Sequence, residues 1–142
     1  MAKILVADDE IDLAEIWKEA LEEAGHSVVL THTGLQTVAM LQEEEFDLLI
    51  TDINMPDGGG VYATSEARNL DSKIPVIAVS GNPGVIGSGM LARLPKLGAD
   101  QILIKPIDLD ELVEVANRTL EIGPRLGIAE LVKSLFAKQE EK

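Results

Sequence analysis

The chain has 142 residues, of which 46% are hydrophobic and 26% charged, values that are typical of one globular domain and exclude a mainly disordered chain. It contains no cysteine, which excludes disulfides, thiolate metal sites and cysteine nucleophiles. No apolar run approaches the ~18 residues of a membrane span, and the N-terminus lacks the apolar stretch of a signal peptide. We therefore expect a cytoplasmic protein without membrane insertion.

The formal net charge is −13, and most of it lies in the first part of the chain. Residues 1–60 carry 14 acidic and 2 basic side chains, whereas residues 61–142 carry 11 and 10. This balance argues against direct nucleic-acid binding, which needs a basic surface.

Five short apolar runs predict β-strands at residues 4–7, 28–31, 48–51, 76–79 and 102–104. They do not alternate with polar residues, which is typical of parallel strands covered on both faces. Segments of helical period lie between and after them, at residues 13–24, 35–45, 60–70, 90–97 and 108–122. Gly25 is placed to end the first helix, and Asp108 and Glu111 have the spacing of a capping box at the last. The alternation predicts an α/β, doubly wound fold.

A further helical stripe follows Gly123 and Pro124, formed by Ile128, Leu131, Val132 and Leu135. We therefore expect one domain over residues 1–123 and a C-terminal helical extension over 124–142. The extension is expected to dock on the domain, and a helix that binds a partner is the alternative.

Polar side chains follow four of the five predicted strands. They are Asp8, Asp9 and Glu10 after the first, Asp52 after the third, Ser80 after the fourth and Lys105 after the fifth. An acid at one strand end is most often a helix cap or a loop residue. Ligands of open α/β sheets bind beyond the carboxyl ends of the strands, so four ends with complementary chemistry favour a functional pocket.

Three close carboxylates repel one another unless a proton or a cation neutralises them. Oxygen ligands with open water positions suit Mg²⁺, with Mn²⁺ as a substitute. Such an ion and Lys105 would attract a phosphoryl group, and Asp52 is then a candidate nucleophile that forms an aspartyl phosphate.

Together these motifs resemble the receiver domain of two-component response regulators, the CheY-like family, over about residues 2–121. The matching segments are residues 4–10, residues 52–56 with Gly60, Ser80-Gly81 and Lys105-Pro106. The resemblance implies a stand-alone receiver with a flavodoxin-like (βα)5 fold and a parallel five-stranded sheet of order 2-1-3-4-5.

The resemblance also implies residue roles. Asp52 would accept a phosphoryl group from a phosphohistidine on a sensor histidine kinase or histidine phosphotransfer protein. Ser80 and Lys105 would each bind a phosphoryl oxygen, and the peptide bond between Lys105 and Pro106 would be cis. The Mg²⁺ ligands that it implies are Asp8, Asp9, Asp52 and the backbone carbonyl of Asn54.

In this family, phosphorylation shifts loops and so changes the surface offered to a downstream protein target, while slow hydrolysis resets the switch. Either a monomer or a phosphorylation-dependent dimer is compatible with the sequence.

The family usually has an aromatic residue three positions before the lysine, but Ile102 occupies this position here. The segment from Ser80 to Lys105 is about three residues longer than usual, with the extra length expected in the glycine-rich residues 81–89. Pro95 interrupts the fourth helical segment.

Other residues favour structural roles. Trp17 lies on the apolar stripe of the first helix and predicts a core position. His26 and His32 flank the second strand, where we expect solvated positions away from the acidic pocket. Glycines 58–60 lack the lysine and spacing of a P-loop and predict a turn.

Two other functions compete with a phosphorylated switch. One is a phosphorylation-independent pseudo-receiver that only binds partners, and the complete set of site residues argues against it. The other is a phosphatase with an aspartyl intermediate. Such enzymes often carry a general acid two residues after the nucleophile, where this chain has Asn54, which cannot serve as an acid. We therefore expect no enzyme beyond slow autodephosphorylation.

Overall fold

The computed structural model describes residues 1–55, 59–70, 74–81 and 98–123. The predictions for the glycine-rich loop beyond Gly81, for the helical segment at residues 90–97 with Pro95, and for the C-terminal extension 124–142 lie outside these residues. The strands are β1 (Lys3–Ala7), β2 (Ser27–Thr31), β3 (Leu48–Asp52), β4 (Val76–Ser80) and β5 (Gln101–Ile104). The helices are α1 (Ile11–Glu23), α2 (Gly34–Glu43), α3 (Gly59–Leu70) and α6 (Leu109–Ile122).

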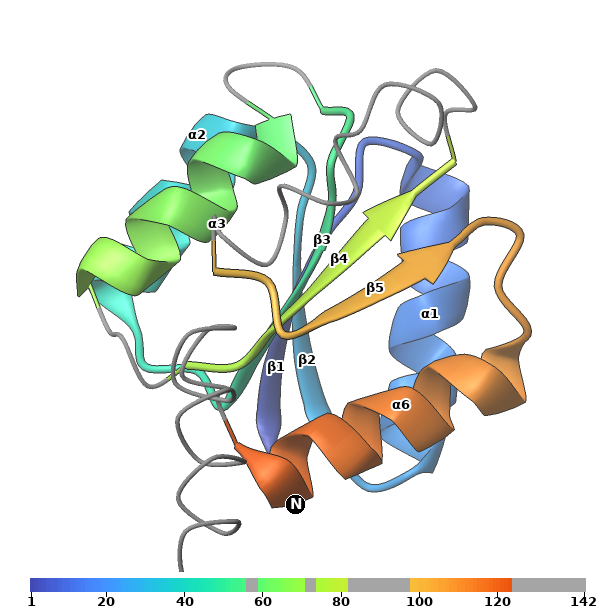
Figure 1. The fold of residues 1–142 in the computed structure, drawn as a ribbon. Coiled ribbons are helices and arrows are strands. Elements are labelled where there is room, and N and C mark those ends of the chain that lie inside the picture. The colour runs from blue at the N-terminus through green and yellow to red at the C-terminus, as the bar shows by residue number, and fades with distance from the viewer. Residues whose placement is uncertain (56–58, 71–73, 82–97, 124–142) are drawn as a thin grey trace, which may run out of the picture.

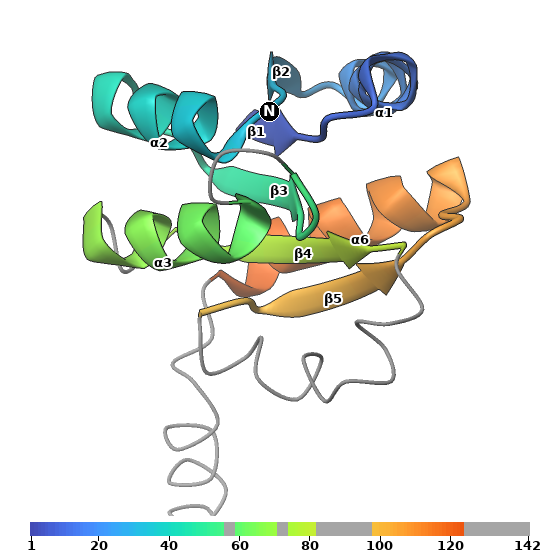
Figure 2. The ribbon, with the colours of Figure 1, turned by 90° about the horizontal axis from the view of Figure 1, so that it is seen from above.

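The five strands form one parallel sheet of order β2-β1-β3-β4-β5, which confirms the predicted order (Figure 1). Helices α1 and α6 cover one face of the sheet and α2 and α3 cover the other (Figure 2). Ile4 and Val6 pack in the core on the α1 and α6 face, whereas Leu5 packs on the opposite face. All three are 0% exposed, which explains why the strands read as continuous apolar runs rather than alternating ones.

Local signals in the sequence set the helix ends. Gly25 has a φ of 99°, and its N–H donates to Glu22 O while the N–H of His26 donates to Leu21 O, the pattern of a Schellman cap. Asp108 caps α6, but its side chain accepts from the N–H of Asp110 rather than from that of Glu111. The cap is therefore present without the reciprocal bonds of a capping box.

Because all strands are parallel, their carboxyl ends lie at one edge of the sheet. The register pairs Ala7 with Thr51 and Asp52 with Val79, so the segments that follow β1 and β3 emerge side by side. Ser80 pairs with Ile104, which brings the start of the segment after β5 to the same edge. Among the helices that the structure describes, none is long and apolar enough to cross a membrane.

Candidate phosphoacceptor and metal site

One lysine and three carboxylates meet at the carboxyl edge of the sheet. The Nζ atom of Lys105 lies 2.9 Å from Oδ2 of Asp8, 2.9 Å from Oδ2 of Asp52 and 3.0 Å from Oε1 of Glu10. With all four groups ionised, one positive charge faces three negative charges. The cluster is therefore two positive charges short of neutrality, which favours the binding of a cation.

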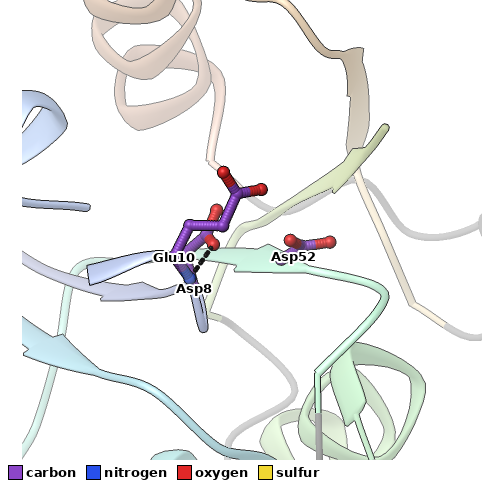
Figure 3. Close-up of side chains that lie close together, drawn as sticks. All are labelled: Asp8, Glu10 and Asp52. Atoms are coloured by element: carbon purple, nitrogen blue, oxygen red, sulfur yellow. Dashed lines mark hydrogen bonds between the residues drawn. The ribbon is translucent and has the colours of Figure 1, made fainter. Parts of the chain in front are cut away.

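Two of the three carboxylates are buried, so solvent screens their negative charges little. Asp8 is 0% and Asp52 4% exposed, whereas the side chain of Glu10 is 62% exposed. One carboxylate oxygen from each residue lies within 4.8 Å of the others, and Figure 3 shows the three side chains at the ends of β1 and β3. Asp8 also accepts a 2.8 Å hydrogen bond from the N–H of Glu10, which fixes the loop that carries both acids.

The pKa values of Asp8 and Lys105 depart from their ordinary range. Burial, with repulsion from Asp52, raises the pKa of Asp8, because together they disfavour the carboxylate more than the N–H of Glu10 and the Lys105 ammonium favour it. Burial alone would lower the pKa of Lys105, but hydrogen bonds to Asp52, Asp8 and Glu10 outweigh it and raise that pKa. Lys105 is therefore charged, and Asp8 binds a proton more readily than an exposed aspartate.

The segment after β3 orients the Asp52 carboxylate. The N–H of Asn54 donates to Oδ1 of Asp52 over 3.0 Å, while Lys105 holds Oδ2. The N–H of Gly60, at the start of α3, donates to Ile53 O. A Cβ on Gly60 would lie 2.0 Å from the backbone oxygen of Asp52, so α3 can begin this close to the site only with glycine there.

Ser80 ends β4 at the same edge, with its hydroxyl fully buried. Within the described part of the chain its Oγ has no hydrogen-bond partner. Its backbone carbonyl accepts from the N–H of Lys105 over 2.8 Å, and the following peptide bond between Lys105 and Pro106 is cis, as predicted. The structure thus joins Ser80 to Lys105 through the backbone, with the hydroxyl free of protein bonds in the described residues.

An open cavity of about 650 Å³ lies above the cluster. It is lined by Asp9, Glu10, Leu13, Trp17, Asp52, Asn54, Gly81, Lys105, Pro106 and Ile107. Asp9 lines this cavity, but the close group of carboxylates contains Glu10 in its place. Glu10 was predicted at this edge without a ligand role, and Trp17 was predicted only as a core residue, yet both line the cavity.

The two histidines correct a prediction. Both are half-buried and hydrogen-bonded rather than solvated. Nδ1 of His32 donates to the backbone oxygen of Asp8 over 2.9 Å, so this ring ties the segment after β2 to the acidic loop. His26 lies at the opposite edge, where its Nδ1 accepts from the N–H of Ala2 and its Nε2 donates to Asn117.

The residues at this edge fit a divalent cation. The donors are carboxylate oxygens, which Mg²⁺ and Mn²⁺ prefer. Oδ2 of Asp8 is fully buried and is held only by its ion pair with Lys105 among the described residues. The open cavity leaves room for the water ligands that Mg²⁺ usually keeps.

Comparisons with known proteins agree with this arrangement. A family model described as the response regulator receiver domain matches residues 4–117. The response regulator receiver protein CpdR of Brucella abortus is 32% identical over 123 residues, which cover 84% of this chain and 98% of that protein. Transcription factor SKN7 of Candida albicans is 32% identical over 117 residues, which cover 82% of this chain but only 20% of that protein.

A solved structure supports the same conclusion. The CheY-like response regulator receiver domain protein of Methanospirillum hungatei superposes with a TM-score of 0.77 at 28% identity, over 85% of this chain and 94% of that one. The sheet order, the acidic edge with its lysine and the family match over most of the chain lead to one identification. The chain belongs to the receiver domain family of two-component response regulators.

Proposed function

We propose that this receiver accepts a phosphoryl group on Asp52 from a phosphohistidine of a sensor histidine kinase or histidine phosphotransfer protein. The observation that carries the proposal is the contact between Lys105 Nζ and Asp52 Oδ2, 2.9 Å apart on a carboxylate that is 4% exposed. In the transfer, a bond forms between an Asp52 oxygen and phosphorus while the bond between phosphorus and the imidazole nitrogen breaks. The Lys105 ammonium then pairs with a phosphoryl oxygen.

A divalent cation supplies charge neutralisation for the phosphoryl oxygens in this reaction. We assign its binding to Asp8, Asp9, Asp52 and the backbone carbonyl of Asn54, with Mg²⁺ as the ion and Mn²⁺ as a substitute. The close group of Asp8, Glu10 and Asp52 supports an acidic metal site at this edge. Asp9 lines the same cavity, from which it would bind the ion directly, with Asp8 as a weaker or water-mediated ligand.

Ser80 is proposed to bind an oxygen of the phosphoryl group on Asp52. Its buried hydroxyl has no partner among the described residues, so a phosphoryl oxygen would supply a missing hydrogen bond. Engaging that oxygen moves the segment after β4 and changes the surface that binds a downstream protein target. Slow hydrolysis of the aspartyl phosphate returns the surface to its first state.

Phosphoryl uptake tests the proposal directly. The chain is incubated with Mg²⁺ and acetyl phosphate, and the phosphorylated fraction is measured by intact mass. We expect uptake by the wild type and none by Asp52→Asn. Asp47→Asn is the matched control, because Asp47 lies at the other end of β3 and accepts the N–H of Lys3. CpdR, treated in the same way, is the positive control. If CpdR takes up a phosphoryl group and the wild type does not, the result would favour a module that binds partners without phosphorylation.

A further inference from the structure

A tryptophan ring lies beside the lysine of the site. Lys105 Nζ is 5.6 Å from the centroid of the Trp17 ring, within the range of about 6 Å over which a cation is attracted to an aromatic face. Trp17 lines the same cavity as Lys105. The ammonium therefore has carboxylates as partners and an aromatic ring as a neighbour.

The ring is fixed by packing, whereas the ion-pair partners of the lysine can change. Trp17 is 1% exposed and belongs to the core cluster that includes Leu21 and Leu112. Lys105 sits on a flexible four-carbon stem, and two of its carboxylate partners, Asp8 and Asp52, are proposed ligands of an incoming cation. When an ion binds those acids, the contact between the ammonium and the Trp17 ring remains.

We infer that Trp17 is a positioning residue that holds the Lys105 ammonium at the edge of the pocket, within reach of Asp52. This inference rests on the proposed function, because the benefit of that position is faster phosphoryl transfer. A ring that restricts the lysine stem lowers the entropy lost when the ammonium meets a phosphoryl oxygen. The expected contribution is roughly three- to tenfold in rate, the range of a partly desolvated cation–π contact.

The contact also gives the inference a spectroscopic readout. Trp17 is the only tryptophan of the chain, so its fluorescence emission reports on this ring alone. An ion bound by Asp8 and Asp52 takes over two of the negative charges that offset the ammonium, so the field of Lys105 at the indole increases while the ammonium stays beside the ring. In Lys105→Met the ammonium is absent, so the same ion should change the emission by half as much or less.

The first experiment measures emission during a titration with Mg²⁺ alone, in the wild type and in Lys105→Met. We expect different starting spectra and an emission change that is at least halved in the variant. Identical starting spectra, or an equal change in both proteins, would overturn the contact between the ring and the ammonium. This experiment does not depend on phosphorylation, so it remains decisive even if the chain accepts no phosphoryl group.

The second experiment measures the rate of uptake from acetyl phosphate at saturating Mg²⁺. We expect Trp17→Leu to be roughly three- to tenfold slower and Trp17→Phe, which keeps an aromatic face, to lie between it and the wild type. Leu21→Val is the control, because Leu21 is equally buried on α1 but does not line the cavity. The inference is wrong if Trp17→Phe is as slow as Trp17→Leu, or if Leu21→Val is slowed equally. Should Trp17→Leu not fold, Trp17→Phe against Leu21→Val still decides.

Discussion

Two partly buried ion clusters lie at opposite edges of the sheet, and the described partners of their cations differ. At the amino edge, Arg68 pairs with Asp100 over 2.5 Å and also donates to the backbone oxygens of Gly98 and Ile74. Asp100 in turn accepts the N–H of Val76. Among the described residues, Arg68 is the cation and Asp100 the anion, and the remaining bonds join α3 to the starts of β4 and β5.

At the carboxyl edge, one ammonium meets three carboxylates. The planar guanidinium of Arg68 suits several fixed partners, whereas the ammonium of Lys105 is a compact charge that can change partners. The described partners of Arg68 include two backbone oxygens, which suits this cluster to stabilise the fold, whereas the described ion-pair partners of Lys105 are all carboxylates, which a second cation could also bind. Burial alone therefore does not distinguish the two clusters, but the kind of partner does.

The largest expected effect is on the cluster at the amino edge. Asp100→Ala leaves the partly buried guanidinium of Arg68 and the N–H of Val76 without their carboxylate. We expect the free energy of unfolding to fall by about 3 kcal/mol, measured by urea denaturation. The loss should be the same with and without Mg²⁺. A loss below about 1 kcal/mol would mean that the amino-edge cluster does not stabilise the fold.

The next effect concerns cation exchange at the carboxyl edge. Lys105→Met removes the ammonium that competes with a divalent ion for Asp8 and Asp52. We expect Mg²⁺ to bind about tenfold more tightly or better in calorimetry, because unit charges about 4 Å apart near a surface interact by several kcal/mol. Asp100→Ala is the control and should leave this affinity unchanged. Unaltered affinity in Lys105→Met would contradict competition between the two cations.

A smaller effect depends on pH. The pKa of Asp8 is raised from 3.8, so the folded chain binds this proton more tightly than the unfolded chain does. The resulting contribution to stability is present at low pH and is lost as the pH rises from about 4 through the native pKa. The free energy of unfolding of the wild type, relative to that of Asp8→Asn, should fall across this window in chelator and then level off. A difference that stays constant with pH would contradict the raised pKa.

The smallest effect belongs to an exposed ion pair. Lys3 Nζ lies 2.5 Å from Glu44 Oε1, but the two side chains are 35% and 41% exposed. Solvent screens such pairs, so Glu44→Gln should change the free energy of unfolding by about 0.5 kcal/mol or less. A change as large as that of Asp100→Ala would show that geometry, rather than burial, decides the strength of these ion pairs.

The sequence predicted the sheet well because its strands are buried on both faces and therefore lack polar interruptions. Asp52 and Ser80 were left out of the predicted strands because they are polar, yet both pair in the ladder. The strand-end rule also placed Asp8, Asp52 and Lys105 together correctly. That rule depends only on parallel order, so it needs no detail of side-chain direction.

Side-chain direction is what the sequence could not supply. Whether Asp9 or Glu10 joins the close carboxylate group depends on the turn between β1 and α1, which the pattern of residues does not determine. The contact between Trp17 and Lys105 requires the packed positions of α1 and the segment after β5. The position of His32 could have been predicted, since β2 beside β1 places the residue after Thr31 next to Asp8.

The close approach at Gly60 limits how this chain can diverge. Only a hydrogen atom fits between the first turn of α3 and the backbone of Asp52. Substitutions are therefore tolerated far more readily at Tyr62, which is 37% exposed on the same helix, than at Gly60. Descendants of this domain can acquire new partners along α3 only while the helix keeps a glycine at position 60, beside the backbone of Asp52.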